Sequence, residues 1–292
     1  MPFTTHIPFR AISTFLLLMA TVASFTACAK GAKPVPTMPP SPIDFAQALQ
    51  YAQRSAVVYE TDAVIRQKAP AGTAVSIMPE TATGIKAYVE IDDAKKIQWI
   101  VVRGTSNLVN IRLDVDYNKV VDARLQVPLH KGFADTALQA YRFAKPLLKP
   151  GYETRVTGHS LGGAAAAIVL MLLKEDGMRL GQAMTFGQPK VTNHQGVAKY
   201  RSLPLLRFVN DKDPVPLMPP LDISTILDEG PYQHFGPEVV LKDGPNYAYF
   251  SEPQAERFSV ISFWNTLGNQ QPPDHPVANY IQSLQAKITG AR

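Results

Sequence analysis

The sequence contains one cysteine, Cys28, among 292 residues. A single thiol excludes an intramolecular disulfide and any zinc site built from several cysteines. The sequence also lacks a large excess of charge of either sign: it has 29 basic and 24 acidic residues, a formal net charge of +5. No dense run of lysines or arginines is present, which argues against nucleic acid as a partner. With 46% apolar and 18% charged residues, the composition is that of a globular chain.

A long membrane-spanning apolar run is also lacking at the N-terminus. Ala11–Ala27 has 17 residues without a charge and ends in small residues. A spanning helix needs about 20 apolar residues, whereas this length after a short basic segment is typical of a secretory signal. We therefore expect residues 1–27 to be a signal peptide and the protein to be exported.

The end of this segment, Phe25-Thr26-Ala27-Cys28, resembles the bacterial lipoprotein box, in which the cysteine becomes the acylated N-terminus. Thr26 and Ala27 match that pattern, and Phe25 departs from it because leucine is usual there. The resemblance implies lipidation of Cys28 and, because Ala29 rather than aspartate follows, an outer-membrane location. The alternative is an ordinary signal peptide, which would leave a periplasmic or secreted protein with a free thiol.

Residues 28–42 are predicted to be a proline-rich tether. Within Lys30–Pro42, five of 13 residues are proline. Such a segment is extended and stiff and would span roughly 40 Å at about 3.1 Å per residue. The folded domain is expected to cover residues 43–292, and its oligomeric state is left open.

Helical and strand patterns alternate through that domain. Asp44–Tyr59 carries an apolar stripe at helical spacing, with a helix start at Ser41-Pro42. Ile97–Val102 is a nearly continuous apolar run, as in a strand buried on both faces. Further strands are predicted at 86–91, 152–157, 181–186 and 204–209, a helix at 132–148, and a hairpin at 236–241 and 247–251. This alternation favours an α/β fold with an open sheet and crossover connections.

One motif carries recognisable chemistry: Gly158-His159-Ser160-Leu161-Gly162 has the pattern G-x-S-x-G. In this pattern a serine sits on a sharp turn between a strand and a helix. Glycine on either side removes side chains that would collide as the chain reverses. A β-rich run precedes the motif and the strong helix former 161–174 follows it. The sequence therefore predicts Ser160 as the nucleophile of a serine hydrolase.

A serine nucleophile needs a general base and an acid that orients the base, in the order Ser, Asp or Glu, His for this type of motif. The histidines that follow the serine are His194, His234 and His275. A hydrophobic strand ends at Asp211 and Asp213, and carboxylates in that position face the crevice of an open sheet. Either aspartate could serve as the acid.

Six motifs resemble those of the class 3 lipases, the fungal-type triacylglycerol lipase family. In order, between about Ile97 and Tyr280, they are VRGTS, HKGF, GHSLGG, TFGQPKV, VNDKDPVP and DHPVANY. The resemblance implies an α/β-hydrolase fold, with a mostly parallel central sheet and helices on both faces. It also implies hydrolysis of acylglycerols or other lipid esters with neither metal nor cofactor.

The resemblance implies roles for single residues as well. The family's acid directly precedes a hydrophobic-Val-Pro element, which maps onto Asp213, although Pro214 replaces the usual aliphatic residue. Asp211 is then a solvated turn residue. The family's histidine maps onto His275, with Tyr280 further along than usual. His234 resembles a structural histidine of the family and is kept as the alternative base.

The remaining expectations concern the oxyanion hole and the other histidines. The residue after the nucleophile, Leu161, contributes its backbone N–H, and by resemblance Thr105 supplies the second donor. His130 and His194 are expected to be structural, and His159 to be a packing residue.

Family lipases carry an amphipathic lid after the oxyanion residue. The corresponding segment, Asn107–Tyr117, alternates apolar and polar residues with period two and lacks a helical stripe. We expect a reduced lid or none, with soluble short- or medium-chain esters as substrates. Alternatives on the same scaffold are a phospholipase, an acyltransferase or a peptidase, and outside enzymes a non-catalytic lipoprotein.

Overall fold

The computed structural model describes residues 34–81, 83–105, 118–219, 230–255 and 274–290. The predicted signal peptide, Cys28 and the segment expected to hold a lid lie outside these ranges. The helices are α2 (Phe45–Val57), α3 (Asp62–Lys68), α4 (Lys131–Ala144), α5 (Leu161–Glu175), α6 (His194–Tyr200) and α9 (Val277–Gly290), with short 3-10 turns at Lys145–Leu147 and Val215–Leu217. The strands are β1 (Ala74–Ile77), β2 (Ala87–Asp92), β3 (Ile97–Val102), β4 (Lys119–Val121), β5 (Pro128–His130), β6 (Glu153–His159), β7 (Ala183–Phe186), β8 (Leu205–Asn210), β9 (Glu238–Leu241) and β10 (Tyr247–Phe250).

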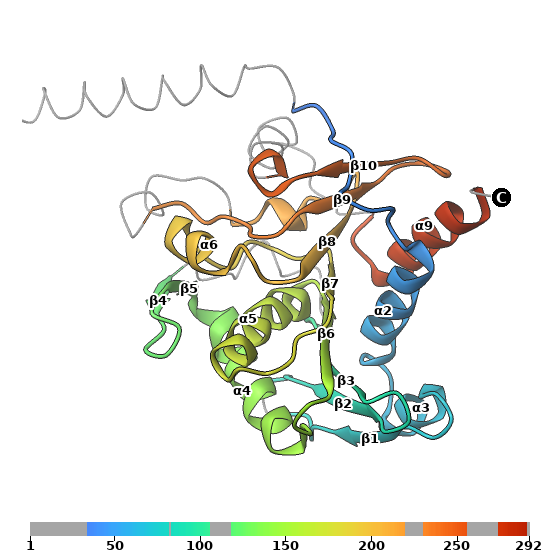
Figure 1. Cartoon of the computed structure of the whole chain (residues 1–292), viewed down its shortest axis with the longest axis vertical. Helices are drawn as coiled ribbons and strands as arrows, with labels where there is room; N and C mark the ends of the chain where they lie inside the picture. The colour runs from blue at the N-terminus through green and yellow to red at the C-terminus, as the bar shows by residue number, and fades with distance from the viewer. Residues whose placement is uncertain (1–33, 82, 106–117, 220–229, 256–273, 291–292) are drawn as a thin grey trace, which may run out of the picture.

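A twisted sheet forms the centre of the domain, with its strands in the order β1-β2-β3-β6-β7-β8-β9-β10 (Figure 1). The pairs from β3 through β6, β7 and β8 to β9 are parallel, and the two ends of the sheet are closed by antiparallel pairs. The predicted mostly parallel sheet is therefore confirmed. Parallel neighbours require crossover connections, and α4, α5 and α6 provide them between β3 and β8.

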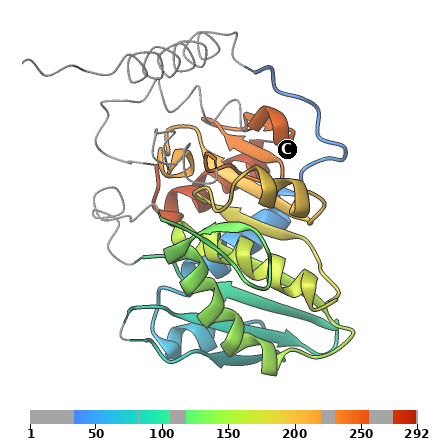
Figure 2. The same ribbon diagram turned by 90° about the vertical axis from the view of Figure 1, so that its left-hand side faces the viewer.

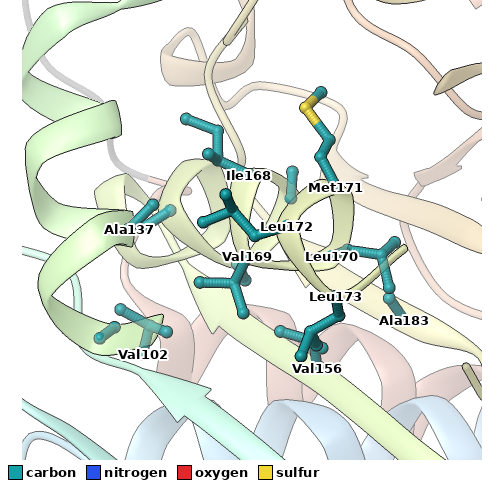
Figure 3. Close-up of a cluster of buried hydrophobic side chains, with 14 of the residues drawn as sticks. Val102, Ala137, Val156, Ile168, Val169, Leu170, Met171, Leu172, Leu173 and Ala183 are labelled. Carbon is teal, nitrogen blue, oxygen red and sulfur yellow. The ribbon is translucent and has the colours of Figure 1, made fainter. Parts of the chain in front are cut away.

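Helices cover both faces of the sheet (Figures 1 and 2). On one face α4, α5 and α6 form a hydrophobic core with the inner side chains of the sheet. On the other face α2, α3 and α9 form a second core. Helix α5 is the most buried of the described helices: every residue from Gly162 to Leu173 is buried. Its side chains pack on Val102, Val156 and Ala183 of three adjacent strands, and Ala137 of α4 covers it (Figure 3).

The start of α2 differs from the sequence-based expectation by a few residues. The N-cap is Asp44, whose carboxylate accepts the N–H of Gln47 at 2.8 Å, and not Ser41-Pro42. An aspartate in this position satisfies an amide that has no partner within the helix. The helix therefore begins where a cap is available, and Ser41 and Pro42 lie outside it.

The last part of the predicted tether lies along an edge of the sheet. Thr37 donates its N–H to the carbonyl of Tyr249 in β10 at 2.9 Å, and its hydroxyl to Gln254 Oε1 at 3.1 Å. The domain thus holds the chain from Thr37 onward. Among the helices that the structure describes, none is long and apolar enough to cross a membrane.

Candidate active site

The turn at Ser160 joins the central strand β6 directly to helix α5. Ser160 has φ 60° and ψ −132°, a conformation that costs a non-glycine residue energy and is held only by its surroundings. Its N–H donates to the carbonyl of Phe186 in the neighbouring strand β7 at 2.9 Å. The predicted strand–turn–helix context of the motif is confirmed.

The two glycines of the motif are required by close backbone contacts. A Cβ added to Gly158 would lie 2.3 Å from the carbonyl oxygen of Gly162. A Cβ added to Gly162 would lie 2.3 Å from the carbonyl oxygen of Val102 and 2.7 Å from the nitrogen of Gly104. The start of α5 therefore packs directly on the loop that follows β3.

Asp213 and His275 meet beyond the end of β8. Nδ1 of His275 lies 2.7 Å from Oδ2 of Asp213, and both side chains are fully buried. The other carboxylate oxygen of Asp213 accepts the N–H of Val215 at 2.9 Å. Tyr280, in the first turn of α9, donates its hydroxyl to Oδ2 at 2.6 Å. Burial and the neighbouring Asp213 raise the pKa of the Tyr280 phenol well above its ordinary value, so the phenol remains a donor.

The carboxylate also determines which imidazole nitrogen carries the proton. Because Asp213 accepts from Nδ1, a neutral His275 has its lone pair on Nε2. Nε2 of His275 and Oγ of Ser160 are both buried, and neither has a hydrogen-bond partner among the residues that the structure describes. Leaving a buried polar atom without a hydrogen-bond partner costs free energy, and in native proteins such atoms occur at catalytic sites. These two atoms are an acceptor and a donor of a proton.

Two candidate oxyanion donors flank the serine. Leu161 is the first residue of α5, where amides have no carbonyl partner within the helix. Thr105 lies in the loop that follows β3 and is partly exposed. Because that loop packs on the start of α5, the structure brings both predicted donors to the side of the sheet where Ser160 lies.

Comparison with known proteins reaches the same residues. The family described as lipase (class 3) matches residues 99–223, a stretch that holds Thr105, Ser160 and Asp213. Over the part that holds the candidate site, the chain is therefore similar to the class 3 lipases. Its fold is the α/β-hydrolase fold of that family, as the sequence predicted.

The similar proteins include secreted and structurally characterised lipases. The chain is 32% identical to a secreted mono- and diacylglycerol lipase of Fusarium solani, over 56% of this chain and 50% of that one. Lipase II from Rhizopus niveus superimposes with a TM-score of 0.60 at 25% identity, over 71% of this chain and 86% of that one. A triacylglycerol lipase described as having a serine protease triad as its catalytic centre superimposes with a TM-score of 0.57 at 25% identity. The match covers 71% of this chain and 85% of that one. The chain spans half or less of the length of the curated relatives that it matches first.

The structure separates the alternatives that the sequence left for acid and base. Asp211 is exposed, whereas Asp213 is buried against His275. His234 lies behind the turn that follows Asp213, with its Nε2 2.7 Å from the carbonyl of Pro216. Burial, with nearby Arg207 and Lys190, lowers the pKa of His234 well below its ordinary value, so it is neutral. Its position supports the turn.

Two other histidines have positions that suit structural roles. His130 caps α4, accepting the N–H of Phe133 at 3.5 Å and stacking on its ring. His194 is exposed at the first position of α6. In the described part of the chain, no group of three or more His, Cys, Asp or Glu side chains is arranged to hold a metal ion.

Sequence reasoning missed Tyr59 and undervalued His159. Nε2 of His159 lies 2.7 Å from the carbonyl oxygen of His275, so this side chain contacts the candidate base and is more than packing. Its Nδ1 lies 3.1 Å from the hydroxyl of Tyr59, which in turn accepts the N–H of Gly104 at 3.1 Å. Nothing in the sequence pattern around Tyr59 indicates these contacts, because its partners follow it by 45 and 100 residues.

Proposed function

We propose that this protein is a carboxylic ester hydrolase that acts on acylglycerols or other lipid esters through Ser160, Asp213 and His275. The observation that carries the proposal is the buried contact between Asp213 Oδ2 and His275 Nδ1 at 2.7 Å. It leaves Nε2 of His275 free to accept a proton, and Ser160 holds its buried hydroxyl without a partner among the described residues.

The proposed mechanism follows from these positions. Ser160 Oγ attacks the ester carbonyl while Nε2 of His275 takes the hydroxyl proton, and Asp213 stabilises the imidazolium that forms. The backbone N–H of Leu161 and the donor at Thr105 bind the tetrahedral oxyanion, each such donor lowering the barrier by about 3 kcal/mol. His275 then gives its proton to the leaving alcohol, and water hydrolyses the acyl-enzyme with the same base.

The substrate class is supported by the relatives. The Fusarium solani protein is named as a mono- and diacylglycerol lipase, and two of the similar solved structures are lipases. The period-two pattern of residues 107–117 favours soluble short- or medium-chain esters over an activity that requires an interface. A phospholipase, an acyltransferase or a short-chain esterase is the alternative on the same scaffold.

Labelling with a fluorophosphonate tests the nucleophile. We expect the wild-type protein to be labelled on one residue, and Ser160→Ala to fold normally without label, because the reagent traps only an activated serine. Labelling of the alanine variant would show that another residue is the nucleophile. Absence of label on both would support a non-catalytic lipoprotein.

A substrate panel then distinguishes the ester classes. Rates on p-nitrophenyl esters of increasing chain length, triacylglycerols and phospholipids give the head-group and chain preference. A steady rise in rate through the solubility limit of a short-chain ester is expected. A sharp increase at emulsion formation would contradict the expectation of a reduced lid.

We further propose that the protein is exported and anchored to the outer membrane through Cys28, the alternative being a periplasmic or secreted enzyme. The nine residue steps from Cys28 to Thr37 would span roughly 28 Å if extended, which is shorter than the full linker because Thr37 is bound to β10. In a bacterial host fed labelled palmitate, we expect label on the wild type and none on Cys28→Ser. An unlabelled, unanchored wild type would rule out the lipid anchor.

A further inference from the structure

A continuous chain of hydrogen bonds lies behind the reacting atoms of the candidate site. It begins at the backbone N–H of Gly104, passes through the hydroxyl of Tyr59 and the ring of His159, and ends at the carbonyl of His275. The three links measure 3.1, 3.1 and 2.7 Å. It therefore connects the loop before Thr105, the turn before Ser160 and the candidate base.

Chemistry fixes the direction of every link. The carbonyl of His275 can only accept, so Nε2 of His159 must carry the proton. Burial, and then the nearby His275, lower the pKa of His159 well below its ordinary value of 6.5. A neutral ring has one N–H, so its Nδ1 accepts from Tyr59. Burial raises the pKa of Tyr59 to about 12, so its hydroxyl donates to His159 while its oxygen accepts from Gly104.

The two ends of this hydrogen-bond chain are parts of the site that must be held at a fixed separation. Gly104 directly precedes Thr105, the proposed oxyanion donor, and His275 carries the proposed base. The middle of the chain, His159, directly precedes the nucleophile. Tyr59 follows the end of α2, and the facing helix α9 begins two residues after His275. Links of one direction also polarise one another, which strengthens the whole chain.

The neutral state of His159 suits this position. Its ring centroid lies 4.6 Å from that of His275, and Tyr59 and Tyr280 pack edge-on against it. When His275 accepts the proton of Ser160 it becomes positively charged. A second positive charge at this distance would oppose that step, whereas a neutral ring does not.

We propose that Tyr59 and His159 are positioning residues that set the distance between the oxyanion donor at Thr105 and Nε2 of His275. The proposal rests on the proposed ester hydrolysis. Under this proposal Tyr59, which follows α2, affects the chemical step although it is not itself a reacting group.

Tyr59→Phe tests the proposal, since it removes only the hydroxyl and leaves Gly104 N–H and His159 Nδ1 without their partner. We expect kcat for each fluorophosphonate-titrated site to fall roughly 10- to 100-fold, the range produced by displacements of about 1 Å in an active site. KM should change less than about twofold, because the chain contacts no substrate. His159→Leu should lower kcat as well, and the double variant should lose less than the product of the two losses, because residues acting as one unit are not additive.

Tyr51→Phe is the matched control. Tyr51 lies on α2, the helix that ends just before Tyr59, is fully buried, and donates its hydroxyl to the carbonyl of Gln182 at 2.6 Å. It should lower thermal stability and leave kcat per titrated site unchanged. Equal kcat values for Tyr59→Phe and Tyr51→Phe, or strictly multiplicative losses in the double variant, would overturn the positioning role. A wild type that neither takes the label nor hydrolyses any ester would instead overturn the proposed function, and the positioning role with it.

Discussion

Replacing Asp213 with asparagine is expected to lower kcat about 10⁴-fold, as loss of the orienting carboxylate does in serine proteases. Asp213 accepts hydrogen bonds from Nδ1 of His275 and from the hydroxyl of Tyr280. An asparagine that turns its NH₂ group toward Nδ1 would favour the tautomer with the proton on Nε2. That nitrogen could then no longer take the proton of Ser160, although the fold around it would be intact.

Asp211→Asn is the control for this prediction. Asp211 is exposed two residues away in the same turn, so its substitution should leave kcat and KM near the wild-type values. Steady-state kinetics on a soluble ester, normalised to active sites titrated before substrate is added, compares the two variants. A large loss for Asp211→Asn with a small one for Asp213→Asn would reverse the assignment of the acid. Similar small losses for both would mean that the base is oriented by another group.

Glu238→Gln is expected to reduce the free energy of unfolding by about 3–5 kcal/mol, the usual result of removing one partner of a buried ion pair. Glu238 on β9 lies opposite Arg207 on β8, with Oε2 2.7 Å from Nη1. The side chains are only 3% and 1% exposed. The neutral amide would leave the Arg207 charge in the protein interior without a counter-ion.

Urea denaturation of four proteins tests this: the wild type, Glu238→Gln, Arg207→Met, and the double variant Arg207→Met/Glu238→Leu. Because the double variant replaces both charges with apolar groups of similar size, it should be close to the wild type in stability. Asp135→Asn provides the surface comparison, since Lys131 and Asp135 are each 58% exposed and solvent screens such a pair. A Glu238→Gln protein no less stable than Asp135→Asn would contradict the prediction.

Several features of the fold could be predicted because they depend on short stretches of chain. Residues 97–102 form a buried strand, and residues 161–175 form a helix that is buried from Gly162 to Leu173. Both could be predicted because a continuous run of apolar residues indicates burial on all sides. Gly158 had to be glycine for a local reason, the close approach of the Gly162 backbone across the turn, whereas Gly162 is required by its contact with the distant backbone of Val102. Helix α9 was missed because three prolines, at positions 272, 273 and 276, precede it, a composition typical of a loop.

In the candidate site, too, some features depend on local sequence and others on tertiary contacts. Its candidate nucleophile and its likeness to a family could be recognised from residues close together in the chain. The order of the motifs limited the acid to two aspartates and the base to three histidines, with a family resemblance choosing among them. Local sequence carries this information because the turn, strand and helix that present Ser160 are built from neighbouring residues.

The contacts of the acid and the base depended on tertiary structure. Asp213 is distinguished from Asp211 by burial against His275, 62 residues away, and by the Tyr280 hydroxyl, 67 residues away. The link from Gly104 through Tyr59 and His159 to His275 likewise joins segments that only the packing of α2 and α9 on the sheet brings together. The sequence by itself determined the candidate nucleophile and its turn. The tertiary structure decided which side chains hold the candidate base, because those hydrogen bonds form only after distant strands and helices have packed.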